Sequence, residues 1–166
     1  MKLTWPWNRP KDNYWLLLLS IITAQAAGLL GSLFTFSAIP TWYVTLDKPF
    51  FSPPNWLFGP VWTILYTLMG ISAYLIWRKH QFKAKAKPFW RVYLIQLCLN
   101  ALWSIIFFGF KWTGLAFIEI LLMWWFIKET IRESHKLDPL ASNLLYPYLA
   151  WVSFASLLNA AIYYLN

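Results

Sequence analysis

The chain is short of acidic residues and of cysteine, and it lacks the usual catalytic motifs. Only six of its 166 residues are Asp or Glu, against fourteen Lys or Arg. Its single cysteine, Cys98, excludes an internal disulfide and a Cys-rich metal site. His80 and His135 are too isolated to predict metal ligation. No Ser-His-Asp constellation, CxxC, HExxH or Gly-rich phosphate loop is present, so the sequence predicts no standard enzyme and no cofactor.

Apolar residues, in contrast, are abundant. They make up 60% of the sequence and charged residues only 12%, which is a membrane composition. The apolar residues form five stretches, each near the length of about 20 residues that crosses a bilayer as a helix: 14–38, 56–77, 89–108, 114–131 and 144–165. We therefore predict an all-α membrane protein, a single five-transmembrane-helix bundle that forms one domain over 1–166.

The basic residues predict an orientation for this bundle. One side would carry twelve of the fourteen Lys and Arg: Lys2, Arg9, Lys11, Arg78, Lys79, Lys83, Lys85, Lys87, Arg91, Lys128, Arg132 and Lys136. The other side would keep Lys48 and Lys111. By the positive-inside rule the N-terminus is cytoplasmic in a prokaryotic cell membrane, whereas an outer or organellar membrane need not follow the rule. We expect the basic side to contact anionic lipid and not nucleic acid.

The N-terminus allows two interpretations. Three basic residues precede an apolar run that contains Ala24-Gln25-Ala26, a pattern that loosely resembles a signal peptide with its cleavage site. The apolar run continues past this point to Phe36, which is longer than the apolar part of a signal peptide. We therefore favour a retained helix.

The break at 39–55 is the longest and holds four prolines, Pro40, Pro49, Pro53 and Pro54. Proline fixes φ and removes a donor, so this segment cannot be helical throughout. It is also too apolar for a linker in water, and we expect a lid-like loop that folds back over the helix ends. An interfacial loop held by its aromatic residues is the alternative. No internal repeat is visible, which argues against common secondary-transporter architectures.

Polar and aromatic residues recur at helical spacing within the spans. Such residues turn toward protein or a cavity when the surroundings are lipid. Each of three spans places one such set on one face: Trp62, Tyr66 and Gly70; Gln96, Asn100 and Trp103; and Trp151, Ala155 and Asn159. A fourth set, Ala24, Gly28 and Ser32, favours close helix packing.

The function of the polar residues stays open at this point. Gln96 and Asn100 could bond between helices or contact a ligand. Glu119, the carboxylate about one turn into the fourth predicted span, could be a proton relay or could bond a nearby loop.

Eight of the 13 tryptophans fall into two sets. One set lies at predicted helix ends and fits the interfacial aromatic belt: Trp15, Trp56, Trp77, Trp90 and Trp112. Trp62, Trp103 and Trp151 lie inside the spans and on the polar faces. Inward indoles suit a large flat apolar ligand, and plain core packing is the alternative.

Four motifs in order carry a resemblance to a known family. They are Trp42-Tyr43-x-x-Leu46-x-Lys48-Pro49-x-x-x-Pro53-Pro54-x-Trp56, Gly59-Pro60-Val61-Trp62-x-x-Leu65-Tyr66-x-x-Met69-Gly70, Leu99-Asn100-x-x-Trp103-x-x-Ile106-Phe107-Phe108-Gly109, and Leu144-Leu145-Tyr146-Pro147-Tyr148-Leu149-Ala150-Trp151-x-x-Phe154-Ala155-x-x-Leu158-Asn159. Together they resemble the TspO/MBR family of translocator proteins, peripheral-type benzodiazepine receptors and tryptophan-rich sensory proteins, over about residues 14 to 166.

The resemblance implies a five-helix bundle whose pocket opens toward the first loop. It implies porphyrin or other tetrapyrrole ligands, with sterol or benzodiazepine-type ligands in animal members, and it allows a homodimer. By motif the ligand-binding residues would be Trp42, Tyr43, Pro49, Pro53, Pro54, Trp62, Tyr66, Asn100, Trp103, Trp151, Ala155 and Asn159. Trp62 and Trp151 match tryptophans linked in some members to light-dependent porphyrin breakdown, so an enzyme-like degradation is the alternative to sensing, sequestration or transport.

Two departures from the family pattern and one question of geometry accompany this resemblance. Phe51 stands where members usually carry Trp, and no basic residue follows Tyr163 and Tyr164 as the sterol pattern requires. At about 1.5 Å per residue, Trp62 lies roughly 9 Å and Trp151 roughly 21 Å from the outer ends of their spans. The two can meet one ligand only if the helix ends are offset or the ligand is long.

Overall fold

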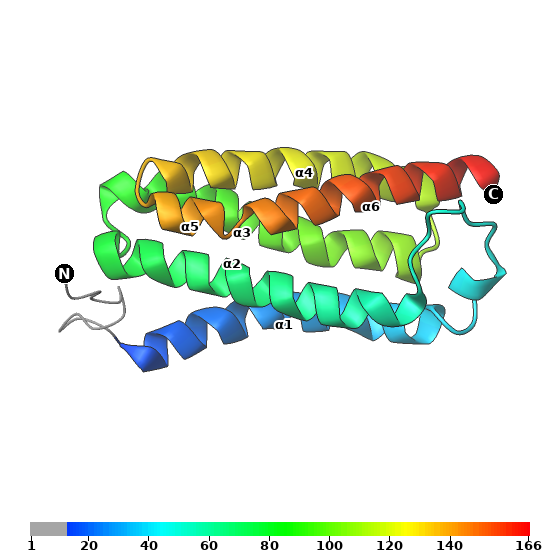
Figure 1. Cartoon of the computed structure of the whole chain (residues 1–166), viewed down its shortest axis with the longest axis horizontal. Coiled ribbons are helices and arrows are strands. Elements are labelled where there is room, and N and C mark those ends of the chain that lie inside the picture. Colours follow the sequence, from blue (N-terminus) through cyan, green and yellow to red (C-terminus); the bar gives the residue numbers. More distant parts are fainter. Residues whose placement is uncertain (1–12) are drawn as a thin grey trace, which may run out of the picture.

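The computed structural model describes residues 13–166, which form a bundle of long helices (Figure 1). Five helices run the length of the bundle: α1 (Tyr14–Ala38), α2 (Phe58–His80), α3 (Lys87–Ser104), α4 (Thr113–His135) and α6 (Tyr146–Leu165). The described residues contain no strand. The predicted all-α fold of five helices is confirmed. Lys2, Arg9 and Lys11, which contribute to the predicted orientation, lie outside the described residues.

Short elements complete the chain. Single 3₁₀ turns lie at η1 (Tyr43–Thr45), η2 (Asn55–Leu57) and η3 (Ala84–Ala86), and α3 continues into a π-helix, η4 (Ile105–Gly109). The break predicted before the last span also holds a helix, α5 (Pro139–Asn143). Asp138 starts it, because its carboxylate accepts the N–H groups of Leu140 and Ala141 at 2.9 and 3.4 Å, and Pro139 suits the first turn.

Four segments are long and apolar enough to cross a membrane: Tyr14–Ala38, Asn55–His80, Ala84–Gly109 and Pro139–Leu165. The fifth long helix, α4, carries several charged residues in its last turns and lies between α3 and α6. The protein is therefore an integral membrane protein.

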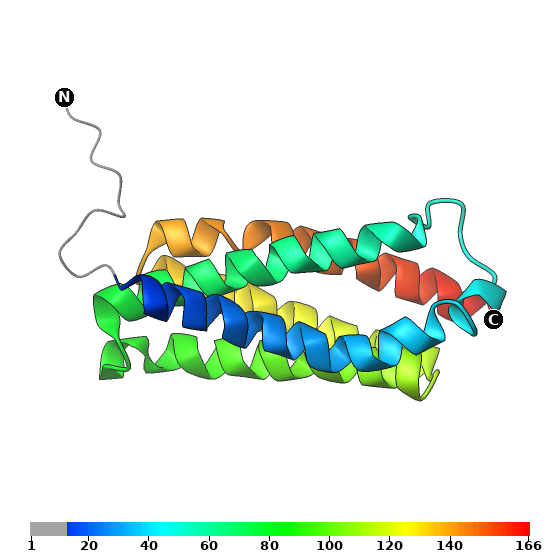
Figure 2. The same cartoon turned by 90° about the horizontal axis from the view of Figure 1, so that it is seen from below.

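Neighbouring helices form pairs, α1 beside α2 and α3, and α4 beside α3 and α6 (Figures 1 and 2). The α1–α2 contact depends on small residues. A Cβ on Gly70 would lie 2.5 Å from the Cα of Ile21, and one on Gly28 would lie 2.2 Å from the Tyr66 ring. Ala24 is fully buried in the same contact. The two helices diverge toward the end of the bundle where the first loop lies (Figure 2).

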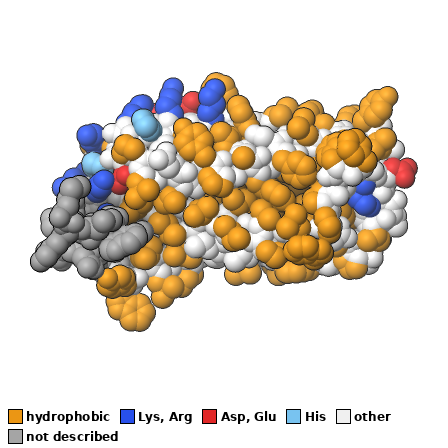
Figure 3. Space-filling model, viewed as in Figure 1, with side chains coloured by type: hydrophobic (Ala, Val, Ile, Leu, Met, Phe, Trp, Pro, Cys, Tyr) orange, Lys and Arg blue, Asp and Glu red, His pale blue; other side chains and the backbone are white. Residues whose placement is uncertain are grey.

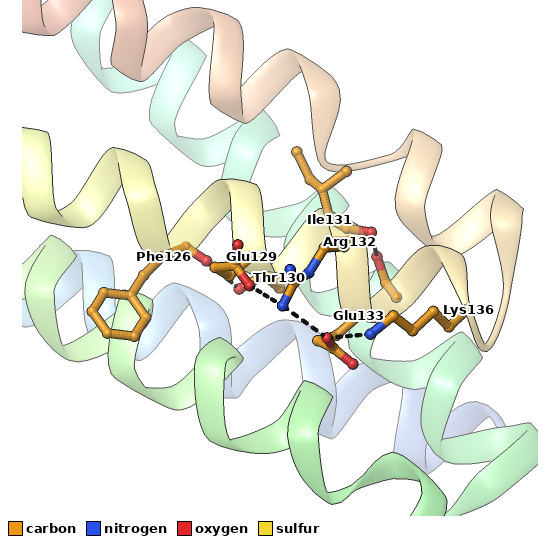
Figure 4. Close-up of polar contacts among 8 residues, drawn as sticks. Phe126, Glu129, Thr130, Ile131, Arg132, Glu133 and Lys136 are labelled. Carbon is orange, nitrogen blue, oxygen red and sulfur yellow. Dashed lines mark hydrogen bonds and ion pairs between the residues drawn. The ribbon is translucent and has the colours of Figure 1, made fainter.

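Most of the charged residues lie at the opposite end of the bundle (Figure 3). In the last turns of α4, Glu129 lies 2.6 Å from Arg132 and Glu133 lies 2.6 Å from Lys136 (Figure 4). The basic partner of each ion pair is exposed to the surroundings, so these pairs contribute little to stability. Lys83, Lys85, Lys87 and Arg91 make no ion pair within residues 13–166, and an anionic lipid surface would favour these charges.

Candidate functional site

The bundle encloses a cavity of about 350 Å³ between α1, α2, α3 and α6. This volume lies at the lower end of the range for small-molecule sites. The wall is mainly apolar and aromatic: Gln25, Gly28, Leu29, Ser32, Thr35, Phe36, Ile39, Asn55, Trp56, Phe58, Gly59, Trp62, Thr63, Tyr66, Trp103, Ser104, Phe108, Trp151 and Ala155. Five of the residues that the sequence nominated therefore line it: Trp62, Tyr66, Trp103, Trp151 and Ala155.

Trp62 and Trp151 face the same cavity from α2 and α6. Trp62 stacks on Tyr66 with ring centroids 5.5 Å apart. Trp151 lies edge-on to Phe58, 6.2 Å away and one turn before Trp62. The ends of α2 and α6 near the first loop are offset. Helix α2 begins at Phe58, close to Trp62, whereas α6 continues for several turns past Trp151, and Asn166 after its last turn bonds Asp47 in the first loop. This offset brings two tryptophans of different depth in their own spans to one level.

Trp103 is the third cavity indole, and its orientation is held by Asn159. Its Nε1 donates to Asn159 Oδ1 at 3.1 Å, and Asn159 Nδ2 donates to the Thr113 carbonyl at 2.8 Å. Asn159 thus connects α3, α4 and α6. Both the oxygen and the nitrogen of its side-chain amide thus bond other residues of the protein. Asn159 also borders a smaller cavity of about 20 Å³ beside the main one.

The π-helix explains how three successive residues turn inward. Ile106, Phe107 and Phe108 are all buried, which the 3.6-residue period of an α-helix does not allow on one narrow face. The wider turn lets Phe107 stack on Trp103, with centroids 5.1 Å apart, while Phe108 reaches the main cavity. π-turns of this kind are frequent at functional sites.

Asn100 lies behind the cavity wall and does not line it. Its Oδ1 accepts the Tyr66 hydroxyl, and its Nδ2 donates to the Tyr148 hydroxyl oxygen at 2.9 Å. The structure therefore uses Asn100 to bond α2, α3 and α6 together. Gln96, one turn earlier, is buried with no hydrogen-bond partner among the described residues.

The first loop packs on the ends of η4 and α6. Trp42 contacts Phe107 edge-on at 5.6 Å, and Tyr43 is buried against Phe58, Phe107 and Phe108. Lys48 holds the turn, since its Nζ donates to the Tyr43 carbonyl at 2.9 Å.

The nominated residues of this loop do not line the main cavity. Of the nominated loop residues only Tyr43 lines a cavity, the smaller one, whereas Trp42, Pro49, Pro53 and Pro54 line neither. Phe51 contacts Phe154 at 6.3 Å, and Phe154 in turn contacts Trp151 at 5.4 Å. The loop thus touches α6 next to the site. Burial raises the pKa of the Tyr43 hydroxyl, so Tyr43 is neutral.

The mouth of the cavity lies between α1 and α2. Leu29, Phe36 and Trp56 line it and are 64%, 75% and 71% exposed on the surface of the bundle. At the inner end Gln25 closes the gap, because its Nε2 donates to the Thr63 carbonyl at 2.9 Å and to Thr67 Oγ1 at 3.1 Å. A ligand in the cavity is therefore reachable from the side that lipid covers.

Sequence reasoning missed these mouth residues. Trp56 was assigned to the interfacial belt alone, and it lines the cavity as well. Gly28 and Ser32 were assigned to helix packing, and both line the cavity too. The three-residue step from Gln25 to Gly28, followed by the four-residue step to Ser32, is a helical face that could have indicated them. No group of three metal-ligating side chains occurs within residues 13–166.

Comparisons with known proteins agree with this architecture. The sequence model of the TspO/MBR family matches residues 20–165. The Tryptophan-rich protein TspO of Archaeoglobus fulgidus is 44% identical, over 90% of this chain and 96% of the relative. The Translocator protein of Homo sapiens is 38% identical over 90% and 89% of the two chains. The Tryptophan-rich sensory protein of Cereibacter sphaeroides is 37% identical over 75% and 77%.

Proposed function

Since this chain belongs to the TspO/MBR family, we propose that it binds a flat apolar ligand of the porphyrin or tetrapyrrole class in the cavity between α1, α2, α3 and α6. The observation that carries the proposal is the convergence of Trp62, Trp103 and Trp151 from three helices on one cavity. Such a site would serve sensing, sequestration or transport of the ligand. Sterol and benzodiazepine-type molecules are further ligands that a cavity of this chemistry could take.

The cavity wall suits a conjugated ring system. The Trp62–Tyr66 stack offers a flat face, and aromatic pairs of this kind add about 0.5–1.5 kcal/mol beyond the burial of area. The Trp151 Nε1 is buried with no partner among the described residues. A buried donor without an acceptor costs about 1–3 kcal/mol, and a ligand carbonyl or carboxylate would remove this cost.

The position of the mouth supports a ligand that partitions into lipid. A porphyrin is broader than the enclosed cavity, and its edge would project between α1 and α2 past Leu29 and Phe36. We propose that the host is a prokaryotic cell membrane, with the basic end of the bundle cytoplasmic.

The test is a titration of protoporphyrin against tryptophan fluorescence on the full chain in nanodiscs. We expect the Trp62→Phe, Trp151→Phe double variant to bind at least about tenfold more weakly, equal to 1.4 kcal/mol. The matched control is Trp15→Phe, Trp125→Phe, which also removes two indoles but from side chains that are 80% and 53% exposed. Equal affinity in the wild type and the cavity variant would contradict the proposed site.

A second candidate function is light-dependent oxidative breakdown of the bound porphyrin, with dioxygen as oxidant and an indole as electron donor. It is favoured by the same two indoles, Trp62 on α2 and Trp151 on α6, which line one cavity. Loss of porphyrin absorbance is measured in light and in darkness, with and without protein. The degradation function requires faster loss in light with the wild type than with the Trp62→Phe, Trp151→Phe variant, and equal rates contradict it.

A further inference from the structure

A chain of hydrogen bonds leads from the cavity wall into the interior of the bundle. Tyr66, whose ring lines the cavity, donates its hydroxyl proton to Asn100. Asn100 donates to the Tyr148 oxygen at 2.9 Å, and the Tyr148 hydroxyl lies 3.6 Å from the Met123 sulfur. Three helices thus contribute one side chain each to a chain that ends on α4.

The inner end of this chain lies beside Glu119. Met123 and Glu119 are four residues apart on α4 and share a face. Glu119 therefore lies one helical turn from the sulfur that the Tyr148 hydroxyl contacts. Glu119 is only 6% exposed, and neither of its oxygens has a hydrogen-bond partner among the described residues.

Gln96 shows the same combination of burial and unpaired atoms. It precedes Asn100 by one helical turn, is 1% exposed, and neither its oxygen nor its nitrogen has a partner within residues 13–166. Unpaired buried polar groups cost roughly 2–7 kcal/mol each in an apolar medium. Gln96 and Glu119 therefore carry a cost that helix packing alone does not require.

No cation of the described residues bonds the Glu119 carboxyl. The other titratable groups in range of the Tyr148 hydroxyl are Tyr66 and Tyr93, and the Tyr93 hydroxyl donates to the Met69 carbonyl at 3.3 Å. Cys98, the single cysteine of the chain, lies on α3 and is exposed on the surface. An ionisable group that is buried within the membrane region without a counterion is by default a functional group.

The Tyr148 hydroxyl is placed to respond to the charge on Glu119. In the structure its neighbour is a thioether, a weak acceptor, whereas a carboxylate is a strong one. A charged Glu119 would draw the Tyr148 proton toward itself. Because bonds in a chain polarise one another, the bonds from Asn100 to Tyr148 and from Tyr66 to Asn100 would then strengthen.

We propose that Glu119 is a proton-exchange site coupled to the ligand cavity through Tyr148, Asn100 and Tyr66. This inference rests on the proposed function of the cavity. Protonated Glu119 leaves Tyr66 free to turn its hydroxyl toward a ligand, and ionised Glu119 holds Tyr66 on Asn100. Ligand binding and the uptake of one proton from solution onto a Glu119 oxygen therefore favour each other, as linkage requires.

The experiment uses protoporphyrin dimethyl ester, whose esterified side chains cannot ionise, and the full chain in nanodiscs. Its dissociation constant is measured from pH 6 to pH 9, together with the change in proton concentration on mixing in weak buffer. For the wild type we expect binding to weaken by about fivefold or more as the pH rises, the lower limit of typical coupling, and protons to be taken up on binding.

Two variants separate the coupling from mere packing. Glu119→Gln removes the exchangeable proton, and Tyr148→Phe keeps Glu119 but removes the hydroxyl that connects it to Asn100. Both should bind the ester with no pH dependence and no proton uptake. The control is Glu133→Gln, because Glu133 pairs with Lys136 at the basic end and should leave the pH dependence unchanged.

The outcomes also separate this inference from the proposed function. Binding whose pH dependence is the same in the wild type and in Glu119→Gln overturns the coupling and leaves the cavity site intact. A pH dependence that survives in Tyr148→Phe overturns the connecting chain. Failure of every folded variant to bind any porphyrin overturns the proposed function, and with it this inference.

Discussion

At the scale of single residues, Asn159 determines the geometry of the cavity wall. Its amide satisfies the Trp103 indole on one side and the Thr113 carbonyl on the other, and the residue is 1% exposed. A buried amide that bonds two other helices fixes their relative positions. It also fixes the Trp103 ring, which in turn stacks on Phe107.

Replacing Asn159 by Ala should therefore leave a buried donor and a buried acceptor unpaired. We expect the free energy of unfolding to fall by about 1–3 kcal/mol. Thermal unfolding followed by circular dichroism measures the change. Trp103→Phe, alone and combined with Asn159→Ala, completes a double-mutant cycle. Strict additivity of the two changes would mean that the bond contributes nothing.

Glycines on α1 and α2 give a second prediction at this scale. A Cβ at Gly70 would lie 2.5 Å from the backbone of Ile21, whereas at Gly28 it would lie 2.2 Å from the side chain of Tyr66. Gly70→Ala must push α1 away from α2, and we expect a loss of about 1–3 kcal/mol in stability. Gly28→Ala should act mainly on ligand affinity, because it displaces a cavity ring.

The control for the stability of both glycine variants is Gly59→Ala, since a Cβ at Gly59 would meet no atom of another element within 4 Å. For ligand affinity the reference is the wild type, because Gly59 itself lines the cavity. Thermal unfolding and porphyrin titration are measured on all three proteins. A Gly70→Ala protein as stable as Gly59→Ala would show that α1 is not held by this contact.

At the scale of elements, one link between α2 and α5 is an ion pair that depends on pH. Lys79 Nζ lies 2.7 Å from Asp138 Oδ2. Burial would raise the pKa of the Asp138 carboxyl, but the hydrogen bond and charge of Lys79 and the N–H groups of Ala141 and Leu140 outweigh it, and the pKa lies below its ordinary value. The ionised carboxylate is thus favoured in the folded protein.

This shift gives the pair a stabilising effect with a definite pH range. Because the folded pKa is below the unfolded value of about 4, the contribution is complete above that pH and is lost as the pH falls through the folded pKa. We expect Asp138→Asn to lower stability at pH 7 by on the order of 1 kcal/mol, since Lys79 is half-exposed. Thermal unfolding of both proteins is measured from pH 7 down to pH 3.

The control is Asp47→Asn, because the Asp47 carboxyl makes no ion pair within the described residues. The stability difference between the wild type and Asp138→Asn should shrink below pH 4. A difference that stays constant across the whole pH range would exclude the ion pair as its cause.

The element scale also shows where sequence reasoning stops. Helical spacing was enough to predict that Trp62, Trp103 and Trp151 face inward, because periodicity is a property of each helix alone. The π-turn of η4 and the helix α5 were not predicted. A π-turn has no composition of its own, and a five-residue helix is too short for a periodic pattern.

At the scale of the whole molecule, the distribution of charge predicts an orientation. Among the described residues nine Lys and Arg lie toward one end and Lys48 and Lys111 toward the other. We expect the basic end to be cytoplasmic and the C-terminus to lie outside. A C-terminal alkaline phosphatase fusion in a bacterial host should be active and a C-terminal green fluorescent protein fusion dark. The reverse result would contradict this orientation.

Hydropathy and spacing were sufficient to establish a membrane bundle of five helices, because the bilayer imposes a length and a composition on each span separately. They also singled out the inward tryptophans. Only the folded bundle determined how the helices meet. It fixed the offset that aligns Trp62 with Trp151 and the position of the cavity mouth between α1 and α2. It also fixed the hydrogen bonds that keep Asn100 away from the cavity. Those features depend on how far one helix is displaced along another, and that displacement is set by contacts between residues far apart in the chain.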